Sequence, residues 1–112
     1  MVFSGIALLI GAAVVSVIAE TTARGRVSVN GGAGIRIPSV MASEESWQAG
    51  HRAARPYLHA TAGALGLAAL CAIFAPTTLA NIALLGGMAI GIASLAAGTV
   101  AAHRAAKKIN NA

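Results

Sequence analysis

Residues 57–75 read YLHATAGALGLAALCAIFA, and after Pro76 residues 77–102 read TTLANIALLGGMAIGIASLAAGTVAA. Neither stretch contains Asp, Glu, Lys or Arg, and neither has a polar face at helical spacing. A third uncharged stretch, Val2 to Ala19, precedes them. In chain order the three would form helices of roughly 27, 28 and 39 Å, against a hydrocarbon core of ~30 Å. Helices that are apolar all round belong in lipid, so the sequence predicts an all-α integral membrane protein with three transmembrane helices.

The composition leaves room for one membrane domain and little else. The chain has 112 residues, of which 57% are apolar and 10% are charged, so a separate globular enzyme domain does not fit. We expect residues 2–19, 57–75 and 77–102 to span the membrane, 20–56 to form a loop, and 103–112 to form a basic C-terminal tail. No charged segment precedes Val2, so we expect a retained first helix and not a cleaved signal.

The net charge of +5 comes from residues outside the three spans. Five arginines lie between the first and second spans, and Arg104, Lys107 and Lys108 follow the third. Three crossings place both groups on one side, and basic residues near span ends favour the cytoplasmic side. We therefore expect the loop and C-terminus inside and the N-terminus and the hairpin at Pro76 outside. A basic rim of this kind contacts anionic lipid head groups, and no nucleic-acid partner is expected.

The first part of the loop is expected to be irregular. Residues 21–30 alternate polar and β-branched side chains. The glycines in residues 31–34 permit positive φ angles, and Pro38 prevents a helix from running through Ile37. The sequence predicts a shaped turn at the membrane surface.

A short interfacial helix is predicted after this turn and before the second span. Ser43 can cap its start, and the carboxylates that follow favour the positive end of the helix dipole. We expect this helix to lie flat on the bilayer, with the Trp47 ring among acyl chains as an anchor, until Pro56 allows a bend. Its apolar edge is predicted to be Trp47, Gly50, Ala54 and Leu58.

Small residues indicate how the second and third spans pack. Their connection at Pro76 is too short for anything except an antiparallel helical hairpin. One face of the third span carries small residues spaced four, three and four apart, which permit close approach of a neighbouring backbone. These helix-packing residues are Gly87, Gly91, Ser94 and Gly98, and the second span offers Ala60, Gly63, Ala64 and Gly66. Three helices bury few residues completely, so we also expect assembly with a second copy or a larger membrane protein.

Few residues in the sequence suggest chemistry. His51 and His59 lack the Cys, His, Asp or Glu cluster that a metal needs. A proton relay at His59 needs a second ionisable group at membrane depth, and the spans contain none. The chain has no Asp for a Ser/His/Asp set, and the glycines near residue 32 lack the Lys-Ser/Thr ending of a phosphate loop. We therefore predict a non-enzymatic protein with no catalytic residues, metal or cofactor.

Polar, aromatic and conformationally special residues gather between the first two spans. One interpretation is structural: Arg36 or Arg52 pairs with Glu44 or Glu45, and the other residues contact head groups. The other is functional, with the segment recognising another protein, and both can hold at once. We call residues 30–55 the interaction loop. Its candidate contact residues are Asn30, Gly34, Arg36, Pro38, Glu44, Glu45, Trp47, His51 and Arg52.

The interaction loop resembles a family signature. Residues 34–39 (GIRIPS), 43–47 (SEESW) and 50–52 (GHR), led by Asn30, resemble the pattern N, G-I-R-T-P, S-E-E-x-W and H-R of the SdpI immunity-protein family of bacterial membrane proteins. The order of one span, signature loop and helical hairpin is also similar. Ile37 stands where the family more often has Thr, and three extra residues follow Asn30.

The resemblance implies a small bacterial inner-membrane protein that acts through protein contacts, with toxin immunity or signalling as one outcome. The longer founding member of the family is implied to sequester a transcriptional repressor at the membrane. An alternative of a different class is a structural or accessory subunit of a larger envelope or respiratory membrane complex, which the glycine-lined third span favours. The expected partners are the lipid bilayer and another membrane protein or a second copy.

Overall fold

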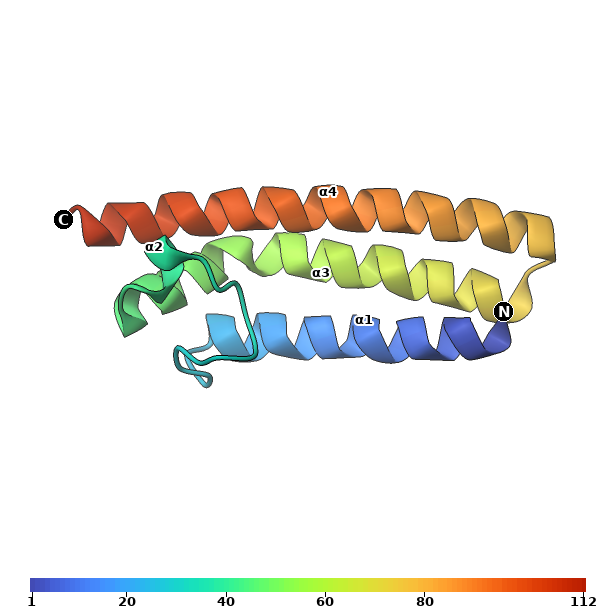
Figure 1. Ribbon diagram of the computed structural model, residues 1–112, viewed down its shortest axis with the longest axis horizontal. Coiled ribbons are helices and arrows are strands. Elements are labelled where there is room, and N and C mark those ends of the chain that lie inside the picture. The colour runs from blue at the N-terminus through green and yellow to red at the C-terminus, as the bar shows by residue number, and fades with distance from the viewer.

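The computed structural model describes all 112 residues, and its only regular secondary structure is helical. Three are long, namely α1 (Val2–Ala23), α3 (Glu44–Phe74) and α4 (Thr77–Asn110), and α2 (Pro38–Met41) is one turn in the connection between α1 and α3. The long helices lie side by side in a body 53 Å long and 21 by 18 Å across (Figure 1). The N-terminus lies at the end where α3 turns into α4, and the connection and the C-terminus lie at the opposite end, called here the loop end.

The surface of the long helices is apolar. Each contains a segment long and apolar enough to cross a bilayer. Phe3, Phe74 and Leu85 point away from the protein, with 89, 81 and 72% of their surface exposed. A water-soluble bundle would bury side chains of this size, whereas hydrocarbon solvates them. The prediction of an all-α membrane protein with three transmembrane helices is confirmed.

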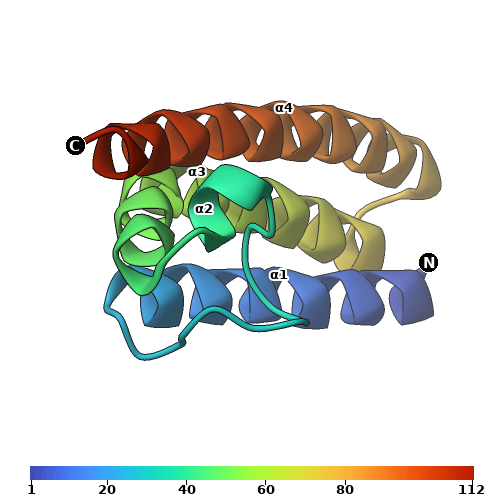
Figure 2. The same cartoon turned by 60° about the vertical axis from the view of Figure 1, so that its left-hand side comes forward.

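The central helix is α3. It packs against both α1 and α4, while no Cα atom of α1 comes within 8 Å of one in α4 (Figures 1 and 2). The chain passes from α3 to α4 through Ala75 and Pro76 alone, and the two helices form the predicted antiparallel hairpin. The position of α3 therefore determines the positions of the other two helices.

The helix expected from Ser43 begins as predicted but does not end before the second span. Ser43 does cap its start, because the Ser43 hydroxyl accepts from the Ser46 N–H and the Ser46 hydroxyl accepts from the Ser43 N–H. The helix is not a separate element, however, since it continues through Pro56 into the second span. Proline lacks the N–H that would bond one turn back, so the helix bends here, and Figure 2 shows its first turns lying across the bundle.

Two helices run beyond the uncharged stretches. α1 continues to Ala23, so residues 21–23 are helical where we expected irregular backbone, and it stops where Gly25 adopts a φ of +74°. α4 continues to Asn110 and binds the connection. The Ser39 hydroxyl and the His103 Nδ1 lie 2.7 Å apart, and the Asn110 amide donates to the Ser39 carbonyl. The basic segment after residue 102 is thus part of the folded loop end.

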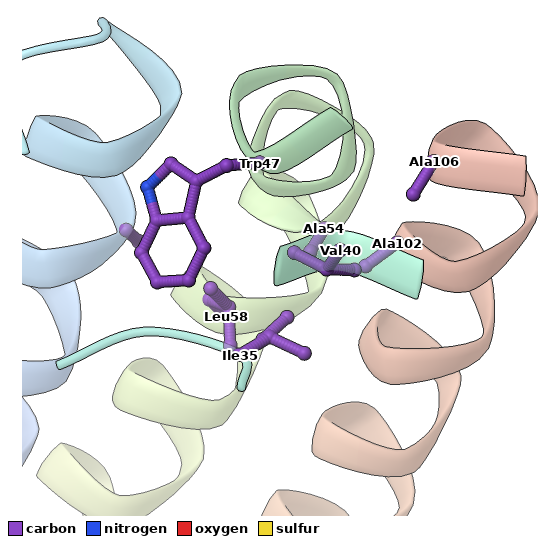
Figure 3. Packing of buried hydrophobic residues seen from close by; sticks show 8 residues of the cluster. Ile35, Val40, Trp47, Ala54, Leu58, Ala102 and Ala106 are labelled. Carbon is purple, nitrogen blue, oxygen red and sulfur yellow. The ribbon is translucent and has the colours of Figure 1, made fainter. Parts of the chain in front are cut away.

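The largest buried side chains gather at the loop end (Figure 3). Trp47 of α3 and Val40 of α2 are buried where the connection covers α3, with 1 and 0% of their surface exposed. The rest of the bundle buries almost only glycine and alanine. The molecule thus has a conventional hydrophobic core only where the chain leaves the predicted membrane spans. This core consists of Ala19, Ile35, Val40, Trp47, Ala54, Leu58, Ala102 and Ala106.

Candidate functional site

The connection between α1 and α3 folds over two aromatic side chains that lie one turn apart on α3. The Trp47 indole Nε1–H donates to the Val27 carbonyl at 2.8 Å, and the Ile35 N–H donates to the His51 Nε2 at 2.9 Å. The two rings lie 4.3 Å apart between centroids. Trp47 and His51 are buried, so each hydrogen bond fixes a backbone segment of the connection to α3.

The His51 imidazole is held in one neutral form. Its Nε2 accepts from a backbone N–H, and its Nδ1 lies 2.8 Å from the Trp47 carbonyl oxygen. A backbone amide can only donate and a carbonyl can only accept, so the proton resides on Nδ1. Both ring nitrogens are therefore occupied, and His51 acts as a structural residue in this arrangement.

Gly34 lets the connection approach these rings. Its φ is +106°, a conformation that other residues rarely adopt. A Cβ at this position would lie 2.7 Å from the Trp47 ring and 2.8 Å from the His51 Nε2. Only glycine therefore fits between α3 and the turn that follows Asn30.

Asn30 and Glu44 hold the turn before Gly34. The Asn30 Oδ1 accepts from the N–H groups of Gly32 and Ala33 at 2.9 and 2.7 Å, and its Nδ2 donates to two backbone carbonyls. The Glu44 carboxylate accepts from the Val29 N–H at 3.2 and 3.3 Å. Asn30 thus organises the turn internally, while Glu44 attaches its start to α3.

Pro38 begins α2, where its missing N–H is no loss. This single helical turn places Val40 against the backbone of Gly50, where a Cβ would lie 3.1 Å from a Val40 methyl group. Ala102 of α4 covers the same glycine. The short helix α2 is therefore held between α3 and α4.

Two expectations for the loop are wrong. The Trp47 ring contacts protein and not acyl chains, because the connection covers it. Arg36 and Arg52 form no ion pair with Glu44 or Glu45, since Glu44 serves the backbone instead. Arg36, Glu45 and Arg52 are exposed, and they carry the charges that the loop presents.

The ion pairs of the protein all involve Glu20 of α1, which reaches α3. The Glu20 carboxylate accepts from Arg55 at 2.8 and 2.7 Å, and the His59 Nε2 lies 2.6 Å from the same group. Arg24 also donates to Glu20 at 3.0 Å. On its other side, the His59 Nδ1 lies 2.7 Å from the Ser16 hydroxyl. We call Ser16, Glu20, Arg55 and His59 the α1–α3 polar cluster.

Sequence reasoning missed this cluster. We expected no second ionisable group near His59, but Glu20 lies directly after the first span and reaches it. A signal was present, because Ser16 and Glu20 are four residues apart, as are Arg55 and His59, so each pair shares a helix face. Which faces meet depends on how α1 packs on α3. Hydrolysis by the Ser16 hydroxyl would need backbone N–H groups that stabilise an oxyanion. Ser16 lies within α1, whose N–H groups bond within the helix, so these groups are not available.

The small residues of α4 pack against α3 within the chain. A Cβ at Gly87 would lie 2.7 Å from that of Ala68 and 3.0 Å from the Ala64 carbonyl oxygen. Gly91 and Gly98 are also buried on this face, while Ser94 is half-buried. The predicted partner surface on α3 meets α4 only in part. Ala64 contacts α4, whereas Ala60 is exposed. A Cβ at Gly63 or Gly66 would lie within 4 Å of no atom of α4.

A comparison with protein families matches residues 26–106 to the SdpI/YfhL protein family. The match covers most of the connection, with α2, α3 and most of α4, and therefore more than half of the chain. The comparisons with curated proteins and with solved structures found no match.

Proposed function

The chain belongs to the SdpI/YfhL protein family, and from this premise we propose that it is a small non-enzymatic protein of a bacterial inner membrane that binds another protein through its interaction loop. Toxin immunity or signalling is the proposed outcome of that contact. The family match includes the whole interaction loop and the hairpin that supports it.

The observation that carries this proposal is the contrast between the buried and exposed sides of the loop. Its backbone is fixed by Trp47, His51 and Asn30, whereas Arg36 projects outward without an ion pair. A surface that is already ordered loses little conformational entropy on binding, which favours recognition of a protein partner. Arginine is also common among residues that dominate protein interfaces.

The arrangement of charges supports a cytoplasmic position for the loop. The five arginines that lie between the first two spans share the loop end with the basic residues of the last turns of α4. Lys and Arg near span ends favour the cytoplasmic side, so the opposite end, with the N-terminus and the α3–α4 turn, is proposed to lie outside.

The second candidate, an accessory subunit of a larger complex, rested on the glycines of the third span. Gly87, Gly91 and Gly98 are buried by α3 of the same chain, so they require no outside partner. The outer faces of α1 and α4 are still available to lipid or to another protein. The interaction loop is therefore the favoured contact surface.

The proposal is tested by changing Arg36→Ala, with Arg104→Ala as a control. Both arginines are exposed at the loop end, but only Arg36 lies in the loop. Arg36→Ala is expected to impair toxin resistance of the host strain or recovery of the bound partner in mild detergent. Membrane insertion should be unchanged, and unfolding free energy should change by about 0.5 kcal/mol or less, because exposed side chains contribute little to stability.

Arg104→Ala should leave resistance and partner recovery unaffected. Equal behaviour of the two variants in both assays would reject the loop as the working surface. Stoichiometric recovery of the chain with a large enzyme complex, without any toxin phenotype in a deletion strain, would support the accessory subunit instead.

A further inference from the structure

A groove of ≈ 390 Å³ runs between α1 and α3 on the side of the α1–α3 polar cluster. Small side chains from both helices line it, with Ala12 and Ala13 on α1 facing Ala62 and Gly63 on α3. Ala13 and Gly63 are exposed, so the groove opens on the surface of the bundle. A Cβ at Gly63 would meet no atom within 4 Å, which means that nothing in the chain fills this space.

The groove ends at polar groups. Ser16 and His59 form part of its wall and belong to the α1–α3 polar cluster, whose Glu20 and Arg55 lie one helical turn beyond. Val2 to Ala19 and residues 57–75 are uncharged. Glu20 and Arg55 therefore lie beyond the apolar stretches, at the depth expected for lipid head groups.

This end of the groove has an excess of positive charge. Arg24 and Arg55 contribute two formal positive charges and Glu20 one negative charge, so these three residues together carry +1. Arg24 uses only its Nε in hydrogen bonds, and Arg55 uses its Nε and Nη2. Their other guanidinium N–H groups have no partner in the chain and can donate to an anion.

We propose that the groove binds one anionic phospholipid. The phosphate accepts from the unpartnered guanidinium N–H groups of Arg24 and Arg55, and an acyl chain lies along Ala12, Ala62 and Gly63. The charge of the phosphate complements the +1 of this end, whereas a zwitterionic lipid brings no net charge. A basic cluster between two helices at the head-group level, next to an apolar groove, matches the two parts of such a lipid.

The test is native mass spectrometry of the full chain in mild detergent, with added phosphatidylglycerol or phosphatidylcholine. The wild-type protein is expected to retain one phosphatidylglycerol in preference to phosphatidylcholine. Gly63→Leu fills the groove and should abolish this adduct. Gly11→Leu is the matched control, because Gly11 is also a helical glycine with no atom within 4 Å of its Cβ position, but it does not line the groove.

A second variant separates loss of binding from loss of folding. Arg24 is exposed, and Arg24→Gln removes one of the two positive charges without entering the core. The preference for phosphatidylglycerol should fall about fivefold, the effect of one basic residue near a membrane surface. The proposal is overturned if Gly63→Leu retains the lipid as Gly11→Leu does, or if Arg24→Gln leaves the preference unchanged.

Soluble glycerol phosphate distinguishes a lipid site from a site for phosphate alone. It lacks an acyl chain, so it should not displace the bound lipid at equal concentration. Displacement by glycerol phosphate would contradict the lipid assignment, and so would a co-purified protein that occupies the groove in place of phosphatidylglycerol.

Discussion

The loop end and the membrane-spanning part of this protein are held together in different ways. At the loop end, Trp47 and His51 are buried and bind backbone groups that are distant in sequence. In the spanning part, Gly87 and its neighbours allow two helix backbones to approach each other. Water drives apolar side chains into a core, whereas lipid does not, so helices in lipid gain from close contact of small residues. One chain therefore packs large side chains together at the end that meets water, and small ones between the helices that lie in lipid.

The largest effect is expected from Trp47→Ala. The side chain is buried and donates to the Val27 carbonyl, so its removal leaves a cavity and an unpaired backbone group. The loss of stability should be about 3–5 kcal/mol, the usual cost of truncating a large aromatic core residue. Loss of helical circular dichroism on heating in detergent measures it.

Phe74→Ala is the control for this comparison, since Phe74 is 81% exposed. Its unfolding midpoint should match that of the unchanged protein. If Trp47→Ala were no more harmful than Phe74→Ala, the loop end would not contain the core described above.

A smaller loss is expected from Gly87→Leu, in the spanning part. A Cβ at Gly87 would lie 2.7 Å from the Ala68 Cβ, so a side chain there must separate α3 from α4. Overpacking of this kind costs about 1–3 kcal/mol. The adjacent Gly86 has no atom within 4 Å of its Cβ position, which makes Gly86→Leu a matched control.

The same thermal melts compare the two glycine variants. Gly86→Leu should unfold at the temperature of the unchanged protein, and Gly87→Leu well below it. Equal midpoints would show that close approach of α3 and α4 contributes little to stability.

The smallest effect concerns the α1–α3 polar cluster, where the two parts meet. Glu20→Gln removes the negative charge that pairs with Arg55 and Arg24. The three groups are partly exposed and therefore solvated, so the unfolding midpoint should fall by less than that of Gly87→Leu. Glu45→Gln, at an exposed carboxylate outside the ion pairs, is the control and should have no effect.

A midpoint for Glu20→Gln that falls as far as that of Trp47→Ala would contradict this ranking. It would place the main attachment of α1 in the polar cluster and not in small-residue packing.

Much of the fold could be predicted from local sequence. The uncharged stretches identified the three transmembrane helices, Pro76 the hairpin and Ser43 the start of α3. The motif around Gly34 and Trp47 indicated the family, and the match over residues 26–106 confirms it. These features depend on residues that are neighbours in the chain, or on composition averaged over a whole helix.

The contacts of the candidate site were harder to predict. Trp47 was expected in lipid, because an aromatic residue near a span is equally typical of a lipid anchor and of a core residue. The pairing of Glu20 with Arg55 joins residues 35 apart in sequence. Similarly, one interpretation paired Arg36 or Arg52 with Glu44 or Glu45, but Glu44 accepts from the Val29 N–H once the connection folds over α3.

The sequence by itself determined the solvent of each segment, since side-chain transfer energies act wherever a residue lies. It also determined the position of the turn at Gly34, because positive φ is a property of a single residue. Only the tertiary structure decided which helix faces meet, and therefore that His59 bonds Glu20 and that His51 lies under Ile35. The physical reason is that pairing between distant segments depends on the rotation and position of whole helices.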